Sequence, residues 1–126
     1  MTKLRLGVLV SGGGSNLQSI IDHCDSGYLP AEVVIVISSK GGVYALERAK
    51  RHNIPSVVVS PKDYPNRQAY EDEMAKILRS YDVGLVVLAG FLKVLSPHFV
   101  NAFQGRIMNI HPSLIPAFCG EGYYGE

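Results

Sequence analysis

The sequence predicts an α/β domain with a mostly parallel sheet and helices on both faces. Short apolar runs alternate with longer segments of helical period, which is the pattern of repeated β-α-β units. The run 85–89 is apolar at every position, as expected of a central strand buried between two helical layers. We find no internal repeat, low-complexity tract or linker, so residues 1–126 are expected to form a single domain.

The clearest helix has five apolar or aromatic residues at the spacing of one core-facing stripe, and Asn66 is suited to cap its start. The stripe residues are Tyr70, Met74, Ile77, Leu78 and Tyr81. The expected helices are 15–25, 43–52 and 66–81, and the expected strands are 4–10, 31–39, 56–59, 83–89 and 106–110. In such a fold, ligands bind at the carboxyl ends of the strands, where the strand order reverses.

Composition argues against several classes of function. A net charge of +1 gives no basic surface for nucleic acid or anionic membranes, and no stretch approaches the length of a membrane span. The start of the chain is a poor signal peptide. Cys24 and Cys119 belong to no CxxC or Cys/His cluster, so we expect reduced thiols in a cytoplasmic protein and no metal site.

A glycine loop follows the first expected strand. Gly12, Gly13 and Gly14 would let backbone amides approach an anion at a helix N-terminus, where a phosphate fits. A simpler alternative is that Ser15 and Gln18 form a capping box that only closes the first helical turn. The loop lacks the Lys-Ser/Thr ending of a P-loop, and Leu17 replaces the third glycine of a dinucleotide fingerprint.

A polar pair interrupts the last expected strand. Asn109 and His111 should point to the same face, with Ile110 on the opposite one, and Pro112 ends the strand. Both side chains could therefore reach one ligand atom from the ligand-binding edge. A buried histidine is by itself more often a core residue than a catalytic one, and the nearby amide raises the case for chemistry.

The segment 89–97 follows the most buried strand. Its apolar residues Phe91, Leu92, Val94 and Leu95 suit a flat aromatic ligand, although local core packing explains them nearly as well. Arg67 lies in the first turn of its helix, where the helix dipole disfavours a cation, and this position favours an anionic partner.

Three segments together resemble the phosphoribosylglycinamide formyltransferase family, the folate-dependent glycinamide ribonucleotide transformylases of purine biosynthesis. They are SGGGSNLQSII, AGFLKVLSP and MNIHPSLIP, and the resemblance extends from the first strand to about Phe118. It implies a Rossmann-like formyltransferase fold. The NIHPSL motif alone would also suit methionyl-tRNA formyltransferase or formyltetrahydrofolate deformylase, and the glycine loop favours the nucleotide substrate.

The resemblance also implies site residues and small-molecule partners. It makes Gly14, Ser15 and Asn16 ligands of phosphoribosyl glycinamide, and His111 the proton donor. It places Arg67, Leu92, Lys93, Val94, Leu95 and Asn109 around 10-formyltetrahydrofolate. Lys93 stands where some relatives have arginine. A lysine keeps the positive charge but lacks the planar guanidinium that can form two parallel hydrogen bonds, so the contact with the folate at this position would differ.

The residues fit formyl transfer chemically. The substrate amine attacks the formyl carbon, and donors placed beforehand stabilise the charge that develops on the formyl oxygen. Asn109 can offer an amide N–H, and His111 can donate a proton and help the folate nitrogen leave.

Family members continue beyond the match, and the resemblance implies an aspartate there that faces the histidine. After His111 the only carboxylates before the chain end are Glu121 and Glu126. We therefore expect a chain that keeps the phosphoribosyl site, transfers formyl groups poorly and self-associates through the exposed sheet beside 106–110. The competing interpretations are a non-catalytic phosphonucleotide-binding module and, less favoured, an NAD-dependent oxidoreductase, because Ser38 stands where an acidic residue would hold the ribose.

Overall fold

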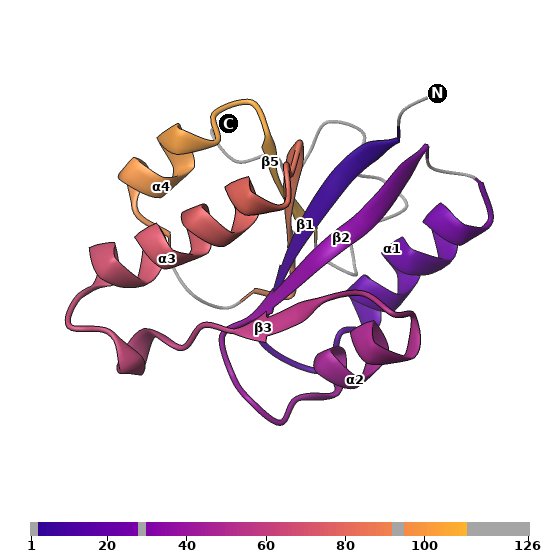
Figure 1. The fold of residues 1–126 in the computed structure, drawn as a ribbon, viewed down its shortest axis with the longest axis horizontal. Coiled ribbons are helices and arrows are strands. Elements are labelled where there is room, and N and C mark those ends of the chain that lie inside the picture. Colours follow the sequence, from indigo (N-terminus) through magenta and orange to yellow (C-terminus); the bar gives the residue numbers. More distant parts are fainter. Residues whose placement is uncertain (1–2, 28–29, 92–94, 111–126) are drawn as a thin grey trace.

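The computed structural model describes residues 3–27, 30–91 and 95–110, and they contain a five-stranded sheet in which all neighbouring strands are parallel (Figure 1). The strands are β1 (Leu4–Val10), β2 (Ala31–Ser38), β3 (Ser56–Val58), β4 (Leu85–Ala89) and β5 (Ile107–Ile110), in the order β3-β2-β1-β4-β5. The chain runs outward from β1 to β3 and then returns to place β4 on the other side of β1. The strand order therefore reverses between β1 and β4.

Helices cover both faces of this sheet, as the sequence predicts (Figure 1). One face carries α1 (Ser15–Asp25) and α2 (Tyr44–Arg51), and the other carries α3 (Arg67–Ser80) and α4 (Pro97–Ala102). A short 3-10 turn, η1 (Pro61–Asp63), leads into α3. None of the helices in the described ranges is long and apolar enough to cross a membrane.

Two cores form on the two faces, and β4 contributes to both by alternation. Val86 and Leu88 lie in the cluster under α3 and α4, whereas Val87 and Ala89 lie in the cluster under α1 and α2. All four side chains are buried, so the prediction that 85–89 is a central strand is confirmed.

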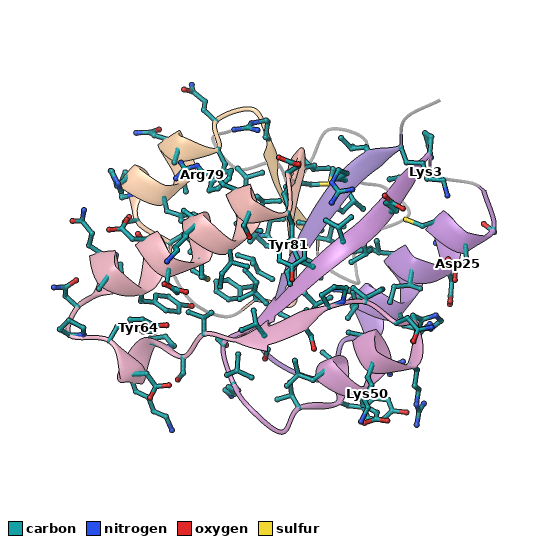
Figure 2. The ribbon with its side chains drawn as sticks, in the orientation of Figure 1. Lys3, Asp25, Lys50, Tyr64, Arg79 and Tyr81 are labelled. Carbon is teal, nitrogen blue, oxygen red and sulfur yellow. The ribbon has the colours of Figure 1, made fainter. Side chains whose placement is uncertain are left out.

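The prediction for α3 is also confirmed. The Asn66 side chain accepts a hydrogen bond from the Ala69 N–H at 2.8 Å, so it caps the helix. Tyr70, Met74 and Leu78 are buried, and Ile77 and Tyr81 pack against the same core. Tyr64 and Tyr81 lie beyond opposite ends of the helix (Figure 2).

Most expected boundaries lie within one residue of those in the structure, and there are two larger differences. The strand expected at 83–89 begins at Leu85, because the Val83 N–H bonds to the Leu78 carbonyl and still belongs to the turn that ends α3. The helix α4 was not expected. Its signals are a Ser96 cap and Pro97 at its first position, and six residues are too few to show a helical period.

Candidate functional site

The carboxyl ends of β1, β4 and β5 meet at one edge of the sheet, at the point where the strand order reverses. Ser11 follows β1, Gly90 follows β4, and β5 ends at Ile110. This is the edge at which parallel α/β sheets bind ligands. The glycine loop and Asn109, predicted from distant parts of the sequence, therefore belong to the same edge.

Gly14 shapes the glycine loop. It is the N-cap of α1 and has a φ of +83°, in the left-handed region that favours glycine. A Cβ at this position would lie 2.7 Å from the Cβ of Ala45 on α2. A Cβ on Gly12 or Gly13 would meet no atom of the described residues within 4 Å. The loop can thus present its backbone to a ligand.

The capping-box alternative for Ser15 and Gln18 is wrong. Gly14 takes the N-cap position, Ser15 is the first helical residue, and the cap makes no side-chain hydrogen bond. The Gln18 amide instead donates to the Asp22 carboxylate at 2.9 Å and accepts from Arg48 at 3.1 Å. The left-handed turn at Gly14 places the Ser15 side chain one position too late to close the turn, and this side chain is exposed.

Asn16 connects the glycine loop to the last strand. Its side chain is buried, with 7% exposed, and its Nδ2 donates to the Ile110 carbonyl at 3.5 Å. This is a long hydrogen bond between residues 94 positions apart in the sequence. It holds the start of α1 against the carboxyl end of β5.

Asn109 lies on β5 beside this contact. It pairs in register with Leu88 and shares the face of the sheet that α3 and α4 cover, whereas Ile110 packs against the core on the other face. Asn109 and Ile110 therefore point to opposite faces of the sheet, as predicted. Asn109 is half-buried. His111, Pro112 and the tail that follows lie outside the described residues.

The predicted folate residues are only partly described. Leu92, Lys93 and Val94 lie outside the described residues. Leu95 is buried, with 6% exposed, and packs in the core under α3 and α4. Arg67 is exposed at the first position of α3. Because α3 ends near the start of β4 and leads into it, Arg67 begins the helix near the carboxyl edge.

A buried carboxylate on α3 binds the end of the segment that follows β4. Glu71 on α3 has only 2% of its surface exposed, and its two oxygens accept hydrogen bonds from the Ser96 N–H at 2.8 Å and the Ser96 hydroxyl at 2.5 Å. Ser96 is also the N-cap of α4. Glu71 therefore fixes the point where the segment after β4 enters its helix. The sequence did not predict the Glu71–Ser96 pair, since the run EDEM at residues 71–74 is typical of an exposed, charged helical turn.

Tyr70 neighbours this pair from within the core. Its hydroxyl is buried and has no hydrogen-bond partner in the part of the chain that the structure describes. Burial, and secondly the charge of Glu71, raise the pKa of Tyr70 to about 12. Tyr70 is thus a neutral core residue at physiological pH.

Arg48 on α2 is a residue of this edge that the sequence did not single out. Its Nε donates to the Gly13 carbonyl at 2.9 Å, and its guanidinium lies 4.6 Å from the centre of the Tyr44 ring. The sequence predicts the helix but does not single out Arg48. The same helix also carries Lys50 and Arg51, and the sequence pattern does not indicate which of the three cations faces the glycine loop.

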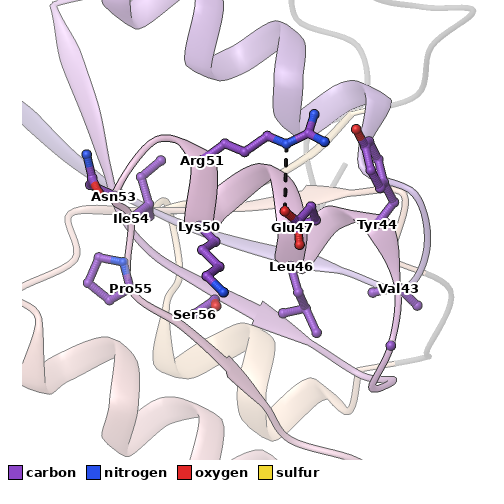
Figure 3. Close-up of a pocket in the computed structure, with 11 residues that line it drawn as sticks. Val43, Tyr44, Leu46, Glu47, Lys50, Arg51, Asn53, Ile54, Pro55 and Ser56 are labelled. Atoms are coloured by element: carbon purple, nitrogen blue, oxygen red, sulfur yellow. Dashed lines mark ion pairs between the residues drawn. The ribbon is translucent and has the colours of Figure 1, made fainter.

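A groove of about 990 Å³ lies on another part of α2 (Figure 3). Its lining comes from residues between 42 and 56, among them Leu46, Lys50 and Pro55 but not Arg48, and a Glu47–Arg51 ion pair of 3.7 Å borders it. None of the predicted site residues that the structure describes lines this groove. Its charged side chains are solvent-exposed, which is typical of a surface hollow beside an edge strand.

Metal-binding and thiol chemistry find little support in the described ranges. These ranges contain no group of three or more His, Cys, Asp or Glu side chains that could hold a metal ion. Cys24 is a free, buried cysteine, and burial followed by the charge of Asp25 raises the pKa of its thiol. A protonated thiol is a poor nucleophile.

The fold and the site define a parallel α/β domain with a glycine loop and a polar strand end at its switch point. The chain belongs to the formyl transferase family, since the family model of that description matches residues 4–125. A phosphoribosylglycinamide formyltransferase from Haemophilus influenzae is 46% identical over 120 residues, which cover 95% of this chain and 57% of the relative.

Two further similarities agree. The trifunctional purine biosynthetic protein adenosine-3 of Chironomus tentans is 47% identical over 120 residues, which cover 94% of this chain and 9% of that protein. The crystal structure of glycinamide ribonucleotide transformylase 1 from Symbiobacterium toebii superposes with a TM-score of 0.84 at 44% identity, covering 93% of this chain and 55% of that one. The chain thus spans about half the length of the single-function relatives it matches.

Proposed function

We propose that this chain takes part in the transfer of a formyl group from 10-formyltetrahydrofolate to the amine of 5-phosphoribosyl glycinamide, a step of purine biosynthesis. The names of its relatives support this reaction. The observation that carries the proposal is the contact between Asn16 and the Ile110 carbonyl, because it sets an anion-binding loop directly against the strand end that bears Asn109.

The phosphoribosyl group is proposed to bind at Gly14, Ser15 and Asn16. Among the described residues, the N-cap Gly14 supplies no side-chain hydrogen bond to the backbone N–H groups at the start of α1, and the helix dipole favours a phosphate there. The exposed Ser15 hydroxyl can add a further donor. The open space around Gly12 and Gly13 leaves room for the ligand.

The reduced folate is proposed to bind along Arg67, the segment Leu92 to Leu95 (with Lys93 and Val94) and Asn109. The position of Arg67 near the carboxyl edge suits an anionic group of this ligand. The hydrogen bonds between the buried Glu71 carboxylate and Ser96 hold the residue that directly follows this segment. Leu95 would then form part of the pocket floor from its place in the core.

In the proposed reaction, the glycinamide amine is the nucleophile and forms the new bond to the formyl carbon. Charge develops on the formyl oxygen, where the Asn109 amide N–H is positioned to stabilise it. The bond between the formyl carbon and the folate nitrogen then breaks, and His111 donates a proton to the leaving nitrogen. The attacking amine loses one proton as it becomes an amide, and this proton restores His111.

The test measures loss of the formyl group from 10-formyltetrahydrofolate with and without phosphoribosyl glycinamide. The proposal expects formyl loss that requires the glycinamide substrate, and expects His111→Ala to abolish it while leaving substrate binding intact. Formyl loss without the amine acceptor would indicate a deformylase. Binding without any transfer, unaffected by His111→Ala, would indicate the non-catalytic phosphonucleotide-binding module.

Three further expectations belong to this proposal. A polypeptide of these 126 residues should transfer formyl groups more slowly than the full-length Haemophilus influenzae relative assayed in parallel. It should self-associate through the β5 edge, and sedimentation at high concentration tests this. The buried, free Cys24 agrees with a cytoplasmic location.

A further inference from the structure

Arg48 makes three contacts that together bear on the glycine loop. Its Nε donates to the Gly13 carbonyl at 2.9 Å, and its Nη1 donates to the Gln18 side-chain oxygen at 3.1 Å. Its guanidinium also lies over the Tyr44 ring, 4.6 Å from the ring centre. The side chain therefore connects α2 to the loop and to the first turns of α1.

The contact with Gly13 fixes the direction of a neighbouring donor. The Gly13 carbonyl and the Gly14 N–H belong to one peptide plane and point in opposite directions, because the bond is trans. Holding the carbonyl toward α2 directs the Gly14 N–H away from α2. Gly14 also lies close to Ala45, so α2 approaches both residues of this peptide.

A loop of three glycines needs such a contact from outside. Glycine has access to more backbone conformations than any other residue, so the loop alone would pay a large entropy cost to hold one arrangement of donors. The described structure supplies no side-chain cap at the start of α1. The Arg48 guanidinium restrains the loop from outside through its hydrogen bond to the Gly13 carbonyl. It also places a positive charge near the proposed phosphate site.

We propose that Arg48 is a positioning residue of the anion site, which orients the Gly13–Gly14 peptide so that the Gly14 N–H faces a bound phosphate. The inference rests on the proposed function, since it assumes that the phosphate of the substrate binds at this loop. Arg48 acts through the loop backbone and need not touch the ligand.

Arg51 provides a matched control. It lies on the same helix, carries the same charge and also approaches the Tyr44 ring, at 5.2 Å. Its ion pair is with Glu47 on α2 itself. Loss of Arg51 therefore reproduces the loss of charge and ring contact without the loss of the hydrogen bond to Gly13.

The experiment measures the affinity of phosphoribosyl glycinamide and of inorganic phosphate by calorimetry, for the wild type, Arg48→Gln, Arg48→Lys and Arg51→Gln. We expect Arg48→Gln to weaken both ligands by about tenfold or more, because a hydrogen bond from a charged group orients the donor. Arg48→Lys should lose less, since it keeps the charge but not the fork. Arg51→Gln should stay within about twofold of the wild type.

An NMR readout separates positioning from general stability. The Gly14 amide resonance should shift on phosphate addition in the wild type and Arg51→Gln, and should shift far less in Arg48→Gln. Affinity of Arg48→Gln equal to that of the wild type, or an unchanged Gly14 response, would overturn the inference. If Arg48→Gln does not fold, Arg48→Lys decides by the same two criteria. Absence of binding by the wild type itself would instead refute the proposed function.

Discussion

Asn16 and Ile110 meet at the switch point of the sheet, where the Asn16 amide donates to the Ile110 carbonyl at 3.5 Å. Asn16 is the second residue of the helix after the glycine loop, and Ile110 ends the strand that carries Asn109. The contact spans 94 positions of sequence and brings the proposed phosphate and formyl regions together. The four predictions below concern buried residues and one left-handed glycine near this edge.

The substitution Asn16→Asp should weaken both the fold and the site. A carboxylate has the same shape but cannot donate to the Ile110 carbonyl, and it places a negative charge near the proposed phosphate. We expect the free energy of unfolding to fall by about 1–3 kcal/mol in denaturant titrations. Phosphate affinity should fall as well. The same change at exposed Asn101 on α4 is the control, and equal effects at the two positions would refute the role of the contact.

Gly14→Ala should be poorly tolerated. Its φ of +83° disfavours a side chain, and the new Cβ would lie 2.7 Å from the Ala45 Cβ. We expect a loss of about 1–3 kcal/mol in stability, measured by denaturant unfolding, together with reduced binding of inorganic phosphate. Gly13→Ala is the matched control, because a Cβ there meets nothing within 4 Å. A Gly14→Ala protein as stable as Gly13→Ala would contradict this explanation of the loop.

Removal of the Glu71 carboxylate should loosen the segment after β4. Glu71→Ala leaves the half-buried Ser96 donors without their acceptors and removes a buried side chain, so we expect the free energy of unfolding to fall by about 2–4 kcal/mol. Glu71→Gln should cost less, since its amide oxygen can still accept from the Ser96 N–H. Exposed Asp72→Ala serves as the control. A double-mutant cycle with Ser96→Ala that shows no coupling would count against the pair.

Tyr70 should make stability fall at alkaline pH. Its pKa is about 12 in the folded protein and about 10 when unfolded, so the unfolded chain releases the proton first. The contribution of Tyr70 is fully present below pH 10 and is lost as the pH rises toward 12. Tyr70→Phe should therefore show a shallower decline than the wild type between these values. Its stability at neutral pH should be unchanged or slightly higher, because the buried hydroxyl has no partner among the described residues. Parallel pH profiles for the two proteins would refute this.

Hydrophobic periodicity and the order of the elements along the sequence predicted most of the fold. Local geometry explains the features that these two patterns did not predict. The stripe on α3 and the apolar run of β4 each repeat often enough to define an element, whereas α4 has six residues and shows no repeat. The order of the elements also placed the glycine loop and Asn109 at one edge.

Contacts between distant segments could not be predicted in the same way. The Arg48 bond to Gly13 joins positions 35 apart, and it depends on which face of α2 meets the loop. The capping-box prediction was wrong for a related reason, because the Ser15–Gln18 spacing does not reveal that Gly14 is left-handed. Backbone conformation in a glycine loop is set by what packs against it.

The most direct test of the account is an NMR titration of isotope-labelled protein with phosphoribosyl glycinamide. The account predicts that the largest amide shifts occur at Gly13 through Asn16, with a smaller response at Ile110. Gly14→Ala should reduce all of these shifts. Shifts confined to the groove lined by residues 42–56, or no response at the glycine loop, would contradict the central claim that this loop holds the phosphate.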